Sequence, residues 1–253
     1  MIAEARKLVE NGCREIVLTG VDITAWGLDL GEGETLGQLV RALLRALPDL
    51  PRLRLSSIDS VEADSHLFAA IAEEERLMPH LHLSLQSGND LILKRMKRRH
   101  SRADAIAFCD KVRKLRPDVV FGADIIAGFP TETDAMFEDS LSLLAECDVT
   151  FLHAFPFSPR PGTPAARMPQ VSRATSGART MIIQDQGGDR LRDKMAKEAG
   201  RRRLILVEGN GIGRTEHYLP VAMPGAPRGA ILPVTIGLTE ENSLTGQILA
   251  EAA

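Results

Sequence analysis

Short β-rich runs alternate with helical patterns through roughly the first 155 residues of the chain. The β-rich runs are 15–19 (EIVLT), 52–58 (RLRLSSI), 80–86 (HLHLSLQ), 119–127 (VVFGADIIA) and 150–155 (TFLHAF). Helical patterns lie near 36–47, 64–76, 90–98, 102–116 and 133–147, and the first dozen residues read as an amphipathic helix. Regular alternation of strand and helix predicts right-handed βαβ units and therefore a parallel sheet.

The pattern changes after Phe157. The stretch 158–169 (SPRPGTPAARMP) contains four prolines, which exclude a regular helix. A polar helix is expected from about 174 to 200, and short strands with glycine turns from Arg202 onward predict a small β-barrel. We therefore expect an α/β barrel domain over residues 1–165, a linker and basic helix over 166–201, and a β module over 202–253.

Polar residues gather at the carboxyl ends of the β-rich runs. They are Thr19–Asp22, Ser56–Asp59, Gln86–Asn89, Asp124 and Gly128–Glu132. The carboxyl ends of parallel strands share one edge, which carries the ligand site in barrels and open sheets. Together the clusters predict a ligand site at one mouth, although each alone is also explained by capping of the next helix.

Two of these clusters suggest particular contacts. In 124–132 (DIIAGFPTE), Gly128 would let a ligand approach the backbone, while the alternative is an ordinary strand-to-helix turn. In 18–22 (LTGVD), exposed backbone N–H groups and Asp22 suit a zwitterionic amino-acid group.

Composition and charge exclude several classes of protein. Hydrophobic residues make up 44% and charged residues 26%, which is typical of a globular protein. No apolar run approaches the ~20 residues of a membrane span, so a transmembrane protein is excluded. The net charge of −3 argues against a generally basic nucleic-acid binder.

Cysteine and histidine spacing predicts no metal site. Cys13, Cys109 and Cys147 are scattered and form no CxxC or CxxxCxxC motif, which favours a reducing cytoplasm over a disulfide framework. His80 and His82 share one face of a predicted strand, but no third ligand has a suitable spacing. We expect packed or hydrogen-bonded roles for both.

Basic residues are concentrated in two segments. Between Asp90 and Asp104 lie six cations and no acid: Lys94, Arg95, Lys97, Arg98, Arg99 and Arg102. A second basic segment covers 190–203. Such runs indicate either a solvated helix face or contact with a phosphate backbone.

Five stretches, in this order, resemble the radical S-adenosylmethionine methylthiotransferases that modify tRNA. They are LTGVDITAWGLDL, RLRLSSIDSVE, LMPHLHLSLQSGNDLILKRMKRRH, DIIAGFPTET and FPFSPRPGTPAARMP. The threonylcarbamoyladenosine branch is the most similar. The resemblance covers roughly residues 5–170 and continues more loosely from 202 as a TRAM module, a small RNA-binding β-barrel.

The resemblance implies a partial radical-SAM (β/α) barrel followed by a TRAM-like module, acting on tRNA in the cytoplasm. The implied reaction adds a methylthio group to C2 of threonylcarbamoyladenosine beside the anticodon, with S-adenosylmethionine and a 4Fe–4S cluster as cofactors. The implied S-adenosylmethionine contacts are Gly20, Asp22, Ser57, Gln86, Asp124 and Ile126. The basic residues Lys94, Arg95, Lys97, Arg98 and Arg99 would contact RNA.

One feature of the family is absent from the sequence. In the family a CxxxCxxC motif at the first barrel strand holds the cluster. We therefore expect a chain that lacks this strand and an N-terminal domain, has no catalytic or metal-ligating residue of its own, and is inactive unless another chain or segment supplies the missing part. The alternatives are a non-catalytic RNA-binding scaffold and an unrelated metabolic barrel enzyme.

Overall fold

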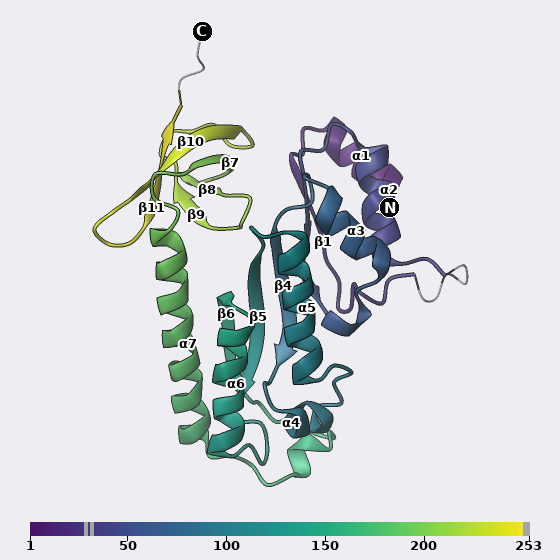
Figure 1. Cartoon of the computed structure of the whole chain (residues 1–253), viewed down its shortest axis with the longest axis vertical. Coiled ribbons are helices and arrows are strands. Elements are labelled where there is room, and N and C mark those ends of the chain that lie inside the picture. The colour runs from purple at the N-terminus through teal and green to yellow at the C-terminus, as the bar shows by residue number, and fades with distance from the viewer. Residues whose placement is uncertain (28–29, 31–32, 250–253) are drawn as a thin grey trace.

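The computed structural model of the protein describes residues 1–27, 30 and 33–249 (Figure 1). Its α-helices are α1 (Ile2–Glu10), α2 (Leu36–Ala46), α3 (Ser65–Glu73), α4 (Asp90–Arg95), α5 (Arg102–Leu115), α6 (Asp134–Glu146) and α7 (Arg173–Ala196). The strands of the first part are β1 (Glu15–Leu18), β2 (Arg52–Leu55), β3 (Ser57–Ile58), β4 (His80–Gln86), β5 (Val120–Ala127) and β6 (Val149–Pro156). The strands of the second part are β7 (Arg202–Gly209), β8 (Ile212–Arg214), β9 (Pro220–Ala222), β10 (Ile231–Leu238) and β11 (Leu244–Ile248).

The first part is an open array of parallel strands. β1 pairs with β2, and β3, β4, β5 and β6 form a second parallel sheet in that order. The predicted single run 52–58 is two strands, because the chain changes neighbours at Ser56, whose N–H donates to the Leu18 carbonyl (2.9 Å). The parallel partial barrel predicted from the sequence is confirmed, with this interruption.

Helices cover the outer face of the array. Along β4 the alternate residues Leu81, Leu83 and Leu85 are at most 2% exposed and belong to the large hydrophobic core that the helices complete. The other alternate set of β4 residues faces the concave side. Because side chains of a strand alternate between faces, the sequence pattern of the strands fixes which residues can line the concave side.

Five helices of the first part begin with a side-chain cap. Side-chain caps at these starts come from Thr35 of α2, Asp64 of α3, Asn89 of α4, Ser101 of α5 and Thr133 of α6. Some polar residues that the sequence places at the mouth therefore cap helices, as Asn89 does. The expected helix 90–98 ends at Arg95, and Lys97 just beyond it has a positive φ of 59°.

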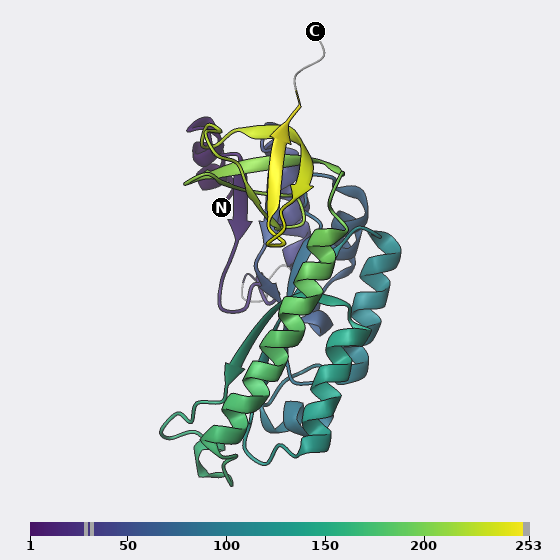
Figure 2. The same ribbon diagram turned by 90° about the vertical axis from the view of Figure 1, so that its left-hand side faces the viewer.

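The long helix α7 runs along the molecule to the C-terminal part (Figure 2). It packs on β6, where Gly187 leaves room for Leu152: a Cβ at Gly187 would lie 2.9 Å from the Leu152 Cβ. Before it, the proline-rich stretch holds a short 3₁₀ turn, Ala165–Arg167. No helix in the described part of the chain is both long and apolar enough to span a membrane.

The C-terminal part is a closed five-stranded barrel with strand order β10-β11-β9-β8-β7. It has its own hydrophobic core, which includes Ile205, Val221 and Val234. Closure leaves no free edge strand, which suits a module of this size. The small C-terminal β-barrel predicted from the sequence is confirmed.

This C-terminal barrel sits against the amino ends of the parallel strands (Figure 1). The buried guanidinium of Arg52 donates to the carbonyls of Leu204 (2.6 Å) and Arg214 (3.2 Å), and that of Arg54 donates to the Glu216 carbonyl (3.2 Å). Arg54 also pairs with Glu15 of β1 (2.9 Å). Buried cations hydrogen-bonded in this way join the two parts into one docked structure.

Candidate functional site

The concave face of the parallel strands carries three successive layers of side chains. At the amino ends, His80 of β4 and Phe151 of β6 meet Tyr218 from the C-terminal barrel, with ring centroids 5.0 Å apart for His80 and Tyr218. The middle layer is His82, Asp124 and His153. The last layer, at the carboxyl ends, contains Gln86, Ile126, Phe155 and Phe157, which line cavities. The C-terminal barrel thus closes one end of the concave face, and the other end is open.

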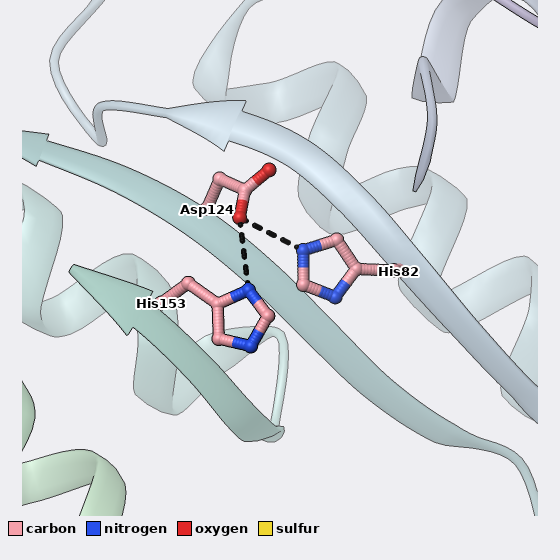
Figure 3. Close-up of side chains that lie close together, drawn as sticks. All are labelled: His82, Asp124 and His153. Atoms are coloured by element: carbon pink, nitrogen blue, oxygen red, sulfur yellow. Dashed lines mark hydrogen bonds and ion pairs between the residues drawn. The ribbon is translucent and has the colours of Figure 1, made fainter. Parts of the chain in front are cut away.

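The middle layer is a compact group from three neighbouring strands (Figure 3). Asp124 of β5 is in register with His153 of β6, and His82 of β4 is in register with Gly122 of β5. The Oδ1 atom of Asp124 lies 3.0 Å from Nε2 of His82 and 3.3 Å from Nδ1 of His153. The two imidazole rings have centroids 4.9 Å apart.

Electrostatics favour the ionised form of Asp124. Burial by itself would raise the pKa of this carboxyl group, but the hydrogen bonds and charges of His82 and His153 outweigh burial and hold the pKa below its usual range. Across the described residues, these two histidines are its only ion-pair partners. The group is therefore an acceptor whose charge is not neutralised by lysine or arginine.

Gly122 makes room for the His82 ring. A Cβ at Gly122 would lie 2.5 Å from Nδ1 of His82 and 3.3 Å from Cβ of Phe151, closer than side chains pack. A glycine inside a central strand weakens the strand, and its usual reason is such a close approach. The middle layer therefore depends on this glycine.

Two adjoining cavities open at the carboxyl ends. One, of about 310 Å³, is lined by Gln86, Asp124, Ile126 and Phe157 among others. The other, of about 370 Å³, shares Gln86, Ile126 and Arg160 and extends to a basic rim that includes Lys97 and Arg98. Gln86 has a φ of +66°, in the left-handed region that non-glycine residues rarely occupy. Strain of this kind is a frequent feature of binding sites.

The structure separates the six residues expected to contact S-adenosylmethionine. Gln86, Asp124 and Ile126 line one cavity, whereas Gly20 and Asp22 line another, of about 210 Å³, beside β1. Ser57 lies in β3, in register with His82. Asp124 is within β5 rather than at its end, and Asp22 accepts from the guanidinium of Arg99 (3.0 Å). The assignment of these six residues to S-adenosylmethionine binding stays a prediction.

The turn after β5 is closed by the protein itself. The N–H of Gly128 donates to the carboxylate of buried Glu132 (2.8 Å), which also pairs with Arg179 of α7 (2.7 Å). A Cβ at Gly128 would overlap Ser176 of α7. The close approach that the sequence suggested for a ligand is made by α7, which favours the alternative of an ordinary strand-to-helix turn.

Most cations of the basic segment 94–102 bond to other groups of the protein. Arg95 donates to the Thr131 hydroxyl, Arg98 to the Ser84 carbonyl (2.8 Å), and Arg99 pairs with Asp22 and Glu62. Lys94 and Lys97 are exposed and make no side-chain hydrogen bond or ion pair with any described residue. Although the sequence holds no acid within this run, folding brings Asp22 and Glu62 to Arg99, and Glu146 to Arg102.

Three cations of the second basic segment, 190–203, likewise lie close to an acidic side chain. Glu198 is fully buried and lies within 4 Å of the cationic groups of Lys194, Arg201 and Arg203. Burial alone would raise the pKa of the Glu198 carboxyl group, but the hydrogen bond and charge of Arg203 outweigh burial and lower it. Much of the charge of this segment therefore holds α7 to the C-terminal barrel.

The cysteines do not converge. Cys109 and Cys147 are both fully buried and their thiols hydrogen-bond; that bond and burial raise the pKa of Cys109. Cys13 lies elsewhere, before β1, and its thiol donates to the Glu15 carbonyl (3.1 Å). All three are free thiols, and no three of them meet at one point.

Sequence reasoning missed several residues of the concave face. His153 has no other histidine near it in the sequence, and the only signal for it is its alternate position on a strand expected to adjoin the one carrying Asp124. No third ligand has a suitable spacing along the sequence for His80 and His82, but the fold brings Asp124 and His153 to His82 from two other strands. Nothing in the sequence indicates that Tyr218 of the C-terminal barrel fills the closed end of the concave face.

Comparison with known sequences identifies the relatives of the chain. Residues 1–144 match the Radical SAM superfamily. The threonylcarbamoyladenosine tRNA methylthiotransferase MtaB of Rickettsia prowazekii is 49% identical over 223 residues, which are 88% of this chain and 53% of that protein. The tRNA-2-methylthio-N(6)-dimethylallyladenosine synthase of Cereibacter sphaeroides is 38% identical over 255 residues, 98% of this chain and 58% of that protein. The chain thus spans little more than half the length of these curated relatives.

Solved structures share the fold at low sequence identity. Coproporphyrinogen III oxidase (HemN) from Escherichia coli matches with a TM-score of 0.53 and 15% identity over 74% of this chain and 47% of that one. The radical S-adenosylmethionine methyltransferase TsrM from Kitasatospora setae matches with a TM-score of 0.51 and 15% identity, covering 65% of this chain and 32% of that one. Since the superfamily match extends over more than half of its residues, the chain belongs to the radical SAM superfamily, and tRNA methylthiotransferases are among its homologues.

Proposed function

We propose that this chain forms the substrate-binding barrel and the RNA module of an enzyme that methylthiolates C2 of threonylcarbamoyladenosine beside the anticodon of tRNA. The observation that carries the proposal is the 49% identity to the Rickettsia threonylcarbamoyladenosine enzyme, against 38% for the dimethylallyladenosine enzyme. In this proposal the units are residues 1–165, 166–201 and 202–253, and the site of action is the cytoplasm, where tRNA is modified.

The open mouth supports binding of S-adenosylmethionine. Ile126 and Phe157 offer apolar contact to an adenine ring, and Gln86 offers an amide donor and acceptor in the same cavity. When bound, S-adenosylmethionine supplies the radical and methyl chemistry of the family. The role of this chain is to bind S-adenosylmethionine and to orient it next to the middle layer. Gly20 and Asp22 line a separate cavity and would take part only as an outer rim.

The residues of this chain do not fit a 4Fe–4S cluster. A cluster of this type needs three converging thiolates, whereas Cys109 and Cys147 are buried together and Cys13 lies elsewhere. Burial and the hydrogen bond also favour the protonated thiol of Cys109. We propose that the ligands come from another chain or segment, and that this chain alone holds no stable cluster and is inactive.

The rim of the mouth supports contact with RNA. Exposed Lys97 lines the 370 Å³ cavity, together with the aromatic pair Phe129 and Phe157 (centroids 5.0 Å apart), and Lys94 is exposed three residues before it. Aromatic faces beside cations suit a nucleotide that has left its stack. Arg95, Arg98 and Arg99 would act mainly by holding the end of α4, which carries Lys94, and the turn after it, which carries Lys97.

The proposed function is tested by deleting the coding region in the source organism and analysing the tRNA nucleosides by mass spectrometry. We expect threonylcarbamoyladenosine to persist and its 2-methylthio derivative to disappear, with recovery when the gene is returned. An unchanged level of the 2-methylthio derivative would overturn the proposal.

A non-catalytic RNA-binding scaffold is the second candidate function, and the arrangement of the cysteines favours it. The same deletion distinguishes the two: a scaffold leaves the 2-methylthio derivative unchanged. In that case the purified chain should still bind tRNA in a filter-binding assay, with an affinity that falls as salt rises.

A further inference from the structure

We propose that His82, Asp124 and His153 form a binding site for a divalent transition-metal ion of the zinc type, with its remaining coordination positions open to the mouth. The inference rests on the arrangement of the middle layer and does not depend on the proposed tRNA reaction. It departs from the sequence analysis, which predicted no metal site.

The separations of the donor atoms suit such an ion. Zinc binds imidazole nitrogen and carboxylate oxygen at roughly 2.0–2.2 Å, which places two donors about 3.0 Å apart at a right angle and about 3.4 Å apart in a tetrahedron. The Asp124 oxygen lies 3.0 Å from the His82 nitrogen and 3.3 Å from the His153 nitrogen. All three donor atoms lie within 4.8 Å of one another. The His153 side chain is 61% exposed, so its ring has room to reorient toward an ion.

The kinds of donor select the kind of ion. Two imidazoles and one carboxylate suit zinc, iron, cobalt and nickel, whereas magnesium and calcium prefer oxygen donors alone. Asp124 supplies a negative charge that no lysine or arginine neutralises within the described ranges. Three protein donors leave positions free for a ligand, which is typical of functional rather than structural metal sites.

The backbone holds the site in place. The donors come from three adjacent strands whose register is fixed by the parallel ladder, with Asp124 directly paired to His153. Gly122 provides the space in which the His82 ring lies. The site faces the 310 Å³ cavity through Asp124, so the oxygen of a ligand bound beside Gln86 and Ile126 would have access to the ion.

Cobalt is the probe that tests the site. The intact chain is freed of metal with a chelator and titrated with Co²⁺, while visible absorbance and calorimetry report binding. We expect one Co²⁺ per chain, displacement by Zn²⁺, and at least a tenfold loss of affinity in His153→Gln and in Asp124→Asn, since even residues that only support ligands change affinity by about 10–100-fold. His153→Gln alters an exposed side chain, so circular dichroism should show an unchanged fold.

The matched control is His66→Gln, an exposed histidine in α3 that is not part of the group. It should bind Co²⁺ as the unaltered chain does. The proposal is overturned if the unaltered chain binds no Co²⁺ at a defined stoichiometry, which would leave the group a hydrogen-bonded trio only. It is equally overturned if His153→Gln and Asp124→Asn bind Co²⁺ with unchanged affinity.

Discussion

The two ends of the concave face are formed by the same strands, but packed side chains close one end and the other end is open. At the amino ends, Tyr218 of the C-terminal barrel stacks on His80, and the guanidinium groups of Arg54 and Arg214 lie 5.0 and 4.6 Å from the Tyr218 ring centroid. At the carboxyl ends, Gln86 and Phe157 line open cavities. One end is closed by packing and buried charge, and the other is left for a ligand.

The difference shows that one end of the parallel strands stabilises the structure while the other end is available to bind a ligand. Buried cations at the closed end bond to backbone carbonyls, as Arg52 does to Leu204 and Arg214, so they join the two parts of the chain. At the open end, polar groups belong to loops and to Gln86, whose positive φ indicates a strained backbone. Barrels generally keep stability at the amino ends of their strands and ligands at the carboxyl ends. The following predictions compare the two ends.

The largest effect is expected from Arg52→Met at the closed end. The change removes a buried guanidinium and its two hydrogen bonds to the carbonyls of Leu204 and Arg214 in the C-terminal barrel, which should cost about 3 kcal/mol of unfolding free energy. Arg160→Met at the open end changes an exposed arginine and should cost less than about 0.5 kcal/mol. Urea unfolding monitored by circular dichroism measures both. Equal losses would show that the two ends do not differ in the way described.

A smaller effect concerns pH and His80. Burial lowers the pKa of His80 to about 3, with further lowering by neighbouring cations such as Arg54, whereas an unfolded histidine titrates near 6.5. The unfolded state therefore binds more protons between pH 3 and 6.5, so the stability supplied by neutral His80 is lost as pH falls through this window. From pH 7 to pH 5 the loss should be about 2 kcal/mol.

His80→Phe should remove this dependence. Neither ring nitrogen of His80 has a hydrogen-bond partner among the described residues, so phenylalanine keeps the packing against Phe151 and Tyr218 without a titrating group. Urea unfolding of both proteins at pH 7 and pH 5 isolates the contribution of this side chain. A pH dependence that His80→Phe leaves unaltered would refute the assignment.

The smallest effect is expected from Lys94→Gln with Lys97→Gln at the open end. Each lost phosphate contact should lower the slope of log affinity against log salt by roughly 0.7–0.9, with little effect on stability. Lys111→Gln with Lys114→Gln, on the exposed side of α5, is the matched control and should leave the slope unchanged. Filter binding of tRNA at several salt concentrations provides the measurement. Identical slopes for the two pairs would mean that the open end makes no RNA contact through these lysines.

The sequence predicts the strands of the array well because their patterns are strong. β4 lies at the predicted residues 80–86, β5 begins one residue later than predicted, and β6 extends one residue further at each end. Local patterns succeed where burial on one face decides the conformation. Side-chain partnerships depend on strands and loops distant in the sequence, as Arg99 shows with Asp22 and Glu62.

The candidate site could be predicted only in part for the same reason. The alternation of His80 and His82 places both on the concave face, but the sequence does not indicate that His80 meets Tyr218 while His82 meets Asp124. The interruption at Ser56 was also hidden, since RLRLSSI reads as one continuous strand. Docking of the C-terminal barrel at the closed end is a tertiary event with no local signal.

The central claim is that the open end receives the ligand while the closed end holds the structure together. Amide hydrogen exchange of the intact chain, with and without an anticodon stem-loop carrying threonylcarbamoyladenosine, tests it most directly. We predict slower exchange on RNA binding in residues 86–100 and 156–165, which surround the open cavities. Protection confined to residues 190–249, with exchange at the open end unchanged, would contradict the claim.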